Sequence, residues 1–129
     1  MQDLKFRNEI TTVTAQAPAT LSNLAVGFDI LGVAISTPCD SVTLHKRHDN
    51  NIIIQNISDN RKLTTDIQKN TASVALSSVL NTLKLNHGFD IFIKKGIPIG
   101  SGMGGSAASA VAALTALNGF FNTPLALAE

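Results

Sequence analysis

The residues best placed for chemistry lie in a glycine-rich segment near the C-terminal end of the chain. Gly100, Gly102 and Gly104 occupy alternate positions, Gly105 and Ser106 follow directly, and an alanine-rich stretch comes next. Glycine lacks a Cβ, so this backbone can turn sharply and lie close against a ligand. A helix starting here would add unpaired N–H groups and a partial positive charge. We therefore predict an anion cradle, whose usual ligand is phosphate, most often that of ATP.

Other glycine-rich patterns fit this segment less well. A flexible linker would lie between polar segments, whereas here an apolar strand pattern precedes the glycines and an apolar helix pattern follows. The Walker loop requires a lysine directly after its last glycine, and none follows Gly105. The dinucleotide pattern Gly-x-Gly-x-x-Gly is formally met, but it should follow the first strand of a parallel unit and precede an acidic residue. The glycine loop of protein kinases leads into a strand, not a helix.

The composition indicates one folded domain and argues against a nucleic-acid partner. The chain has 129 residues, of which 44% are apolar and 15% charged, so it can bury a core. Its net charge is +1, and it has six Phe but no Trp or Tyr, so neither a basic platform nor a base-stacking surface is expected. Cys39 is the single cysteine, and no segment resembles a signal peptide or a membrane span. These features predict a cytoplasmic protein without a membrane partner.

The pattern of apolar residues predicts five strands and two helices. Asn70 suits the N-cap of the first helix, and Asn50-Asn51 suggests a hairpin turn between two strands. Segment Pro18–Asp29 is interpreted as a long connection, and the second helix is apolar around most of its circumference, which predicts burial. The predicted strands are Glu9–Ala17, Ile30–Ser36, Asp40–His48, Ile52–Gln55 and Phe89–Lys95, and the predicted helices are Asn70–Lys84 and Ser106–Phe121. This order favours an α+β fold with a mixed or antiparallel sheet and packed helices.

The preferred interpretation gives no binding role to two residue pairs outside the glycine segment. His45 and His48 would lie on opposite faces of a strand, which argues against a metal site. Lys94 and Lys95 could add positive potential near a phosphate, but a surface strand end is the preferred interpretation.

Two separated segments resemble the motifs of the GHMP small-molecule kinases, which include galactokinase, homoserine kinase and mevalonate kinase. Segment 98–108 is similar to the family's second motif, and segment 17–32 resembles its first. The run from Asn23 through Gly27, Phe28 and Asp29 to Gly32 looks like the homoserine kinase branch. The resemblance extends from about Thr14 to the end of the chain and implies a fold like the second domain of a small-subunit ribosomal protein.

The resemblance implies transfer of the γ-phosphoryl group of ATP to the side-chain hydroxyl of L-homoserine, a step towards threonine, with Mg²⁺ as the metal. Asn23 and Asp29 would bind homoserine, although they could instead shape a turn and cap a strand end. Ser106 would reach Mg²⁺, or only cap its helix, and no catalytic base is assigned. Gly105 departs from the commoner serine of the family. The implied nucleotide-binding residues are Asn70 (or a plain N-cap), Pro98, Ile99, Gly100, Ser101, Gly102, Met103, Gly104, Gly105, Ser106, Ala107 and Ala108.

The end of the chain looks like a helix that has just begun, at Thr123 and Pro124. We therefore expect residues 1–129 to be the N-terminal, nucleotide-binding domain of a longer kinase, with negligible activity alone. A related kinase for another small alcohol and a non-catalytic nucleotide-binding domain are the alternatives. Apolar surface should be exposed on this chain, and it could support a homodimer.

Overall fold

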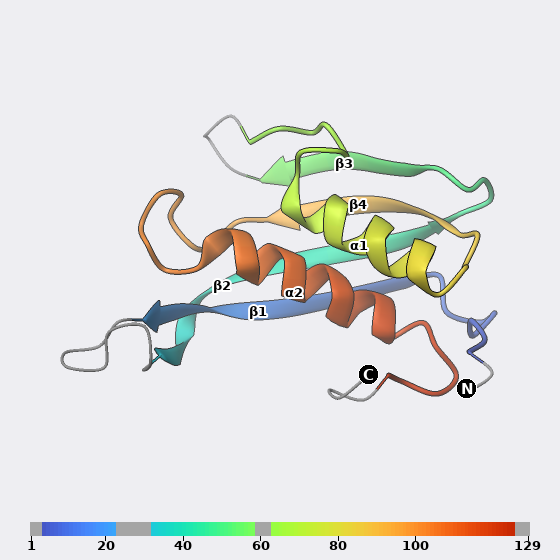
Figure 1. The fold of residues 1–129 in the computed structure, drawn as a ribbon, viewed down its shortest axis with the longest axis horizontal. Coiled ribbons are helices and arrows are strands. Elements are labelled where there is room, and N and C mark those ends of the chain that lie inside the picture. The colour runs from blue at the N-terminus through green and yellow to red at the C-terminus, as the bar shows by residue number, and fades with distance from the viewer. Residues whose placement is uncertain (1–3, 23–31, 59–62, 126–129) are drawn as a thin grey trace.

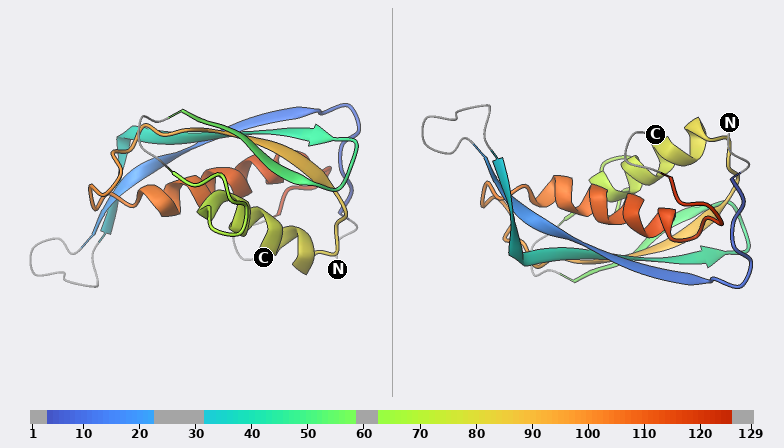
Figure 2. Two further views of the ribbon diagram at one scale, coloured as in Figure 1. Left: turned by 90° about the horizontal axis from the view of Figure 1, so that it is seen from above. Right: turned by 90° about the horizontal axis from the view of Figure 1, so that it is seen from below.

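The computed structural model describes residues 4–22, 32–58 and 63–125, which form a four-stranded sheet covered on one face by two helices. Figures 1 and 2 show both helices on the same side of the sheet. The predicted α+β class with a mixed sheet is confirmed. The elements are β1 (Thr12–Ser22), β2 (Gly32–Arg47), β3 (Ile52–Ser58), α1 (Thr71–Thr82), β4 (Gly88–Lys94) and α2 (Gly105–Asn118).

The strand order is β1-β2-β4-β3, so the predicted hairpin at Asn50-Asn51 is wrong. β4 lies between β2 and β3, antiparallel to the former and parallel to the latter. A parallel pair needs a crossover connection, and α1 provides it. Asp90 on β4 joins both neighbours, because its Oδ1 accepts hydrogen bonds from Arg47 of β2 (2.7 Å) and Gln55 of β3 (2.8 Å).

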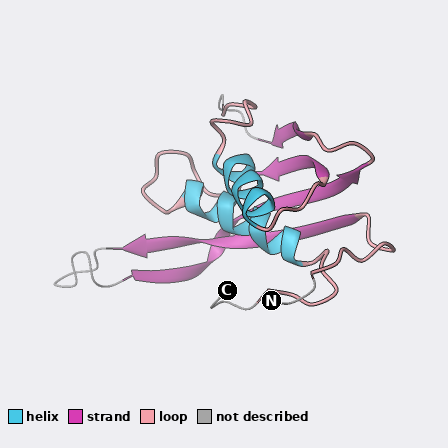
Figure 3. Ribbon diagram, turned by 45° about the vertical axis from the view of Figure 1, so that its right-hand side comes forward, coloured by secondary structure: helices cyan, strands magenta, loops and turns pink. Residues whose placement is uncertain are grey.

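β1 and β2 are longer than the sequence pattern suggested. β1 continues to Ser22, so its last residues are paired strand and not the start of a connection. The two segments predicted as strands around Ser36 and Asp40 belong to one strand, β2, whose pairing with β1 shifts register between Pro18 and Thr20. The outer ends of β1 and β2 extend beyond the helices as a two-stranded ribbon (Figure 3).

The core lies between the sheet and the helices. Alternate residues of β4, Phe89, Ile91 and Ile93, are buried against this layer, as the period of two in a strand requires. α2 contributes small buried residues, which let the helix approach the sheet closely. Its outer face carries Val111, which is 54% exposed, so the predicted burial of α2 is wrong for that face. The described core residues of the helices are Ala72, Leu76, Leu80, Ala108, Ala112, Ala113, Ala116 and Leu117.

The first and last described segments lie side by side. Phe6 and Phe121 form an antiparallel bridge, and Arg7 N donates to Phe120 O at 2.7 Å. The rings of Phe6 and Phe121 meet edge to face with centroids 5.1 Å apart. Lys46 Nζ sits 5.4 Å from the Phe6 ring centroid, a cation–π distance.

Candidate functional site

The glycine segment forms a loop that connects β4 to α2. Gly100, Gly102 and Gly104 have φ values of 74°, 72° and 71°, in the left-handed region that favours glycine. Ser101 and Met103 between them do not have positive φ. Alternation of this kind turns successive N–H groups towards a common side, which is the geometry of an anion-binding concavity.

A cavity of about 380 Å³ lies over this loop. Every residue from 98 to 107 lines it, so the structure brings nearly all of the predicted nucleotide-binding segment together. Asn70 and Thr71 at the start of α1 form another part of the wall. Ala108 does not line the cavity: its N–H donates to Gly104 O at 2.9 Å, and its side chain is buried in the core.

The N-terminus of α2 faces this cavity without a side-chain cap. Its N-cap is Gly104, which has no side chain to accept from the first N–H groups, and no acidic residue lies in the first turn. Ser106 is inside the helix and exposed, so the alternative that it caps the helix is wrong. The open N–H groups and the helix dipole together favour an anion at this end.

Asn70 caps α1, as the sequence predicted. Its Oδ1 accepts from Ala72 N at 3.0 Å, and its Nδ2 donates to Thr64 O at 3.0 Å. Thr71 Oγ1 donates to Ser106 O at 3.1 Å, which ties the start of α1 to the first turn of α2. Asn70 is therefore a structural cap in the cavity wall, and a contact with adenine stays a prediction.

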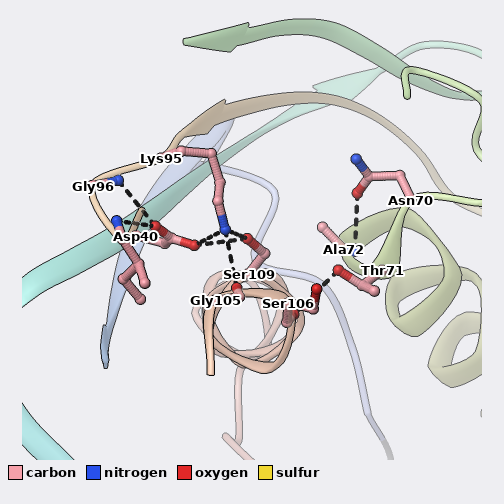
Figure 4. A network of polar contacts seen from close by, with 10 residues as sticks. Asp40, Asn70, Thr71, Ala72, Lys95, Gly96, Gly105, Ser106 and Ser109 are labelled. Atoms are coloured by element: carbon pink, nitrogen blue, oxygen red, sulfur yellow. Dashed lines mark hydrogen bonds and ion pairs between the residues drawn. The ribbon is translucent and has the colours of Figure 1, made fainter. Parts of the chain in front are cut away.

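A buried network behind the loop was not found from the sequence (Figure 4). Lys95 forms an ion pair with Asp40, and the side chains are 6% and 0% exposed. The prediction that Lys95 is a surface strand end is therefore wrong. Its partner lies on β2, 55 residues away in the chain, and no local pattern signals a pair so distant in sequence.

β1 contacts the loop directly. Thr20 N donates to Met103 O at 2.9 Å, so the end of β1 holds one side of the glycine loop. Asn23 and Asp29, the predicted homoserine-binding residues, follow in the sequence and lie outside the described residues. Their roles stay predictions.

The described part of the chain offers no ready-made metal centre. It contains no group of three or more His, Cys, Asp or Glu side chains that could hold a metal ion. His45 Nδ1 shares a hydrogen bond with Thr12 Oγ1 at 2.6 Å. Neither described helix has the length and apolar character needed to cross a bilayer.

The described ionisable groups whose pKa values are shifted lie away from the cavity. Hydrogen bonds from Arg47 hold the pKa of Asp49 well below its usual range, and Asn51 N adds to the effect. Burial, followed by the nearby Lys46, lowers the pKa of His87. No carboxylate is among the described residues that line the cavity, so the wall does not repel an anion.

A glycine loop that leads into an uncapped helix, on a mixed sheet, has the geometry of an anion-binding site. Residues 70–129 match the family model described as the GHMP kinases N terminal domain. The crystal structure of the Methanococcus jannaschii mevalonate kinase shares this fold, with a TM-score of 0.63 at 20% identity over 93% of this chain and 43% of that one.

Within that class, the chain is similar to homoserine kinases. It is 44% identical over 123 residues to the homoserine kinase of Chloroherpeton thalassium, covering 87% of this chain and 39% of the relative. The homoserine kinase of Xylella fastidiosa strain M12 is 45% identical over 86% of this chain and 35% of its own length. The crystal structure of homoserine kinase from Cytophaga hutchinsonii superposes with a TM-score of 0.84 at 38% identity, over 92% of this chain and 38% of that chain. The resemblance predicted from the two motifs is therefore confirmed, and the chain spans under two fifths of the length of these relatives.

Proposed function

We propose that this chain is the ATP-binding part of a kinase that phosphorylates the side-chain hydroxyl of L-homoserine to give O-phospho-L-homoserine. One observation carries the nucleotide part of the proposal: the uncapped N-terminus of α2 and the left-handed glycines line the same cavity. Phosphoryl transfer depends mainly on positioning and charge stabilisation, and a preorganised set of N–H groups serves both. The relatives named homoserine kinase support the choice of alcohol.

The loop would bind the triphosphate, and the start of α1 would lie beside the base. Backbone N–H groups of the loop and the first turn of α2 are the donors, because the described cavity wall provides few charged side chains. Asn70 keeps the start of α1 in place through its two backbone hydrogen bonds. ATP bound in this way would extend its terminal phosphate along the loop.

Ser106 is the residue of the described chain that fits a Mg²⁺ ion bound with the nucleotide. It is exposed in the first turn of α2 and lines the cavity, and Mg²⁺ is commonly held by few protein ligands plus substrate phosphates. Bound Mg²⁺ would neutralise phosphate charge during transfer. Because Ser106 is not the helix cap, replacing it should leave the fold intact.

The metal role of Ser106 can be tested on this chain alone. In the Ser106→Ala variant we expect the melting temperature to stay unchanged, while the gain in ATP affinity on adding Mg²⁺ becomes smaller. Ser101→Ala, which removes an exposed serine hydroxyl from the loop before the helix, is the matched control. An unchanged Mg²⁺ effect in Ser106→Ala would remove the residue from the metal site.

The substrate is tested in a chimera. The aligned segment of the Chloroherpeton thalassium homoserine kinase is replaced by this chain, and coupled ATP turnover with Mg²⁺ is measured for L-homoserine, L-serine, mevalonate and galactose. Turnover with L-homoserine alone supports the proposal. Turnover with another alcohol instead would contradict it and identify that alcohol as the substrate. ATP binding without turnover on any alcohol would favour a non-catalytic nucleotide-binding role.

The predicted homoserine-binding residues are tested in the same chimera. Asp29→Asn should raise the KM for L-homoserine and leave the KM for ATP unchanged, because a carboxylate pairs with the substrate ammonium group. Glu9→Gln, which removes an exposed carboxylate outside the cavity wall, is the control. We further propose that the 129-residue chain has negligible turnover alone, and that the reaction serves threonine synthesis in the cytoplasm.

A further inference from the structure

We propose that Asp40 and Lys95 are a pair of positioning residues that fixes the two ends of the glycine loop relative to each other and so sets its affinity for phosphate. The inference rests on the proposed nucleotide-binding function of the loop. It concerns Asp40 of β2, Lys95 directly after β4, and the start of α2, and the contacts of each member of the pair point to a separate end of the loop (Figure 4).

Asp40 holds the start of the loop. Its Oδ1 accepts hydrogen bonds from Gly96 N at 2.9 Å and from Ile97 N at 3.0 Å. The backbone is closely packed here, because a Cβ on Gly96 would lie only 2.0 Å from Cys39 O. The carboxylate of β2 thus fixes the direction in which the chain leaves β4.

Lys95 holds the end of the loop. Its Nζ donates to Gly105 O at 3.0 Å and to Ser109 Oγ at 3.0 Å, both in the first part of α2. Ser109 Oγ in turn donates to Asp40 Oδ2 at 3.0 Å, which closes the network. The start of α2, whose open N–H groups face the cavity, is therefore connected to the same carboxylate as the start of the loop.

Lys95 lies in the cavity wall, but its contacts argue against a direct phosphate contact. An ammonium group has three donors, and the contacts with Asp40, Gly105 and Ser109 use three. The Asp40 carboxylate also balances its charge. The pair therefore acts through the backbone that it holds, in contrast to the lysine of a Walker loop, which reaches the phosphates itself.

Burial makes this pair a costly way to stabilise a core. Both charges lose their hydration, and well-packed apolar residues often stabilise a protein as well or better. What apolar residues cannot provide is the set of directed hydrogen bonds to Gly96, Ile97, Gly105 and Ser109. We infer that the fixed spacing of these backbone groups is the contribution of the pair.

The test is a neutral double variant, Asp40→Asn with Lys95→Met. The asparagine Oδ1 can still accept from Gly96 and Ile97, while the link to Gly105 is lost and no charge is left unpaired. We expect the Kd for ATP to rise by about tenfold or more, since small displacements of preorganised groups are costly. The Kd for adenosine, which lacks phosphates, should stay within about twofold. An unchanged ratio of the two constants would overturn the inference.

Leu80→Ala separates positioning from loss of stability. Leu80 is a buried residue in the later part of α1, outside the cavity wall, so its replacement lowers stability without contact with the loop. It should leave the ratio of the ATP and adenosine constants as in the unmodified chain. If the double variant does not fold, Ser109→Ala is the alternative, because it removes one member of the network and keeps the ion pair. It should give a smaller rise in the Kd for ATP and leave the Kd for adenosine unchanged.

Hydrogen exchange distinguishes failure of this inference from failure of the proposed function. If the unmodified chain binds neither ATP nor adenosine, the nucleotide proposal fails. The amides of Ala108 and Ser109, which follow the open N–H groups at the start of α2, then report on the pair directly. These amides should exchange faster in the double variant and in Ser109→Ala than in Leu80→Ala. The comparison is made under conditions in which the three variants have similar free energies of unfolding. Equal exchange in all three would overturn the positioning role.

Discussion

The two helices begin in opposite ways. α1 starts at an asparagine whose side chain accepts from the helix backbone, whereas α2 starts at a left-handed glycine that offers no side chain. Both starts contribute to the same cavity wall. The first helix satisfies its own N-terminal N–H groups in part, and the second leaves its groups available. A capped helix start such as that of α1 can support the site, whereas an uncapped start such as that of α2 can bind a ligand.

Among the substitutions that test this difference between the helix starts, a methyl group at the start of α2 should have the largest effect on stability and ATP binding. In Gly104→Ala the left-handed φ is unfavourable, and the new Cβ would lie 2.3 Å from Thr20 Oγ1. We expect a loss of about 2–4 kcal/mol in the free energy of unfolding, together with loss of ATP binding. Chemical denaturation and calorimetric titration measure the two effects. Thr20→Ala combined with Gly104→Ala should recover only part of the stability, because the backbone strain remains; full recovery would show that the φ value is unimportant.

The start of α1 should respond to loss of its cap with a smaller change. Asn70→Ala removes the acceptor for Ala72 N and the donor to Thr64 O, and typical caps contribute about 1 kcal/mol. Urea unfolding should show a loss of this size. Asn70→Asp keeps the acceptor and should lose less stability. If Asn70→Asp also weakens ATP binding strongly, the amide contacts the ligand, and α1 is more than a support.

Gly105→Ala is the matched comparison for Gly104→Ala. The position is helical, and the added Cβ would meet Lys95 Nζ at 3.4 Å and Ile97 Cγ2 at 3.5 Å, which is ordinary contact. Alanine in place of a helical glycine should raise the free energy of unfolding by up to about 0.5–1 kcal/mol. Thermal unfolding checks this value. A large loss would mean that the space between α2 and Lys95 is tighter than these distances indicate.

A change of pH should alter the free energy of unfolding by the smallest amount. Burial and Lys46 lower the pKa of His87, so the folded chain favours the neutral ring. The unfolded chain binds this proton more readily, so the stabilisation is complete above the unfolded pKa of about 6.5 and is lost as pH falls below it. His87→Phe, which keeps a ring against Phe6, should reduce the fall in stability between about pH 7 and pH 5. An unchanged fall would assign the effect to other groups.

Local patterns predicted the parts of the site that depend on neighbouring residues. The capped start of α1, strand β4 and the glycine loop each follow from a short run of sequence, and the structure confirms them. The start of α2 was predicted one residue late, because Gly104 can serve as an N-cap through its conformation without a side chain.

Pairings between distant segments could not be predicted in this way. The order of β2, β3 and β4 depends on the crossover through α1, and two adjacent strands joined by a short turn look alike whether or not they pair. The burial of Lys95 depends on Asp40 in another strand, so the lysine pair looked like surface sequence. Asn23 and Asp29 lie outside the described residues, and their roles depend on the resemblance alone.

The bridge between Phe6 and Phe121 has a practical consequence for circular permutation of the chain. Asn122 N also donates to Lys5 O at 2.8 Å, so the two ends of the described chain are within reach of a short peptide linker. Nearby termini are what circular permutation requires. The ends could be joined and the chain reopened at the exposed turn around Asn50, which would leave the glycine loop and both helices on one continuous segment.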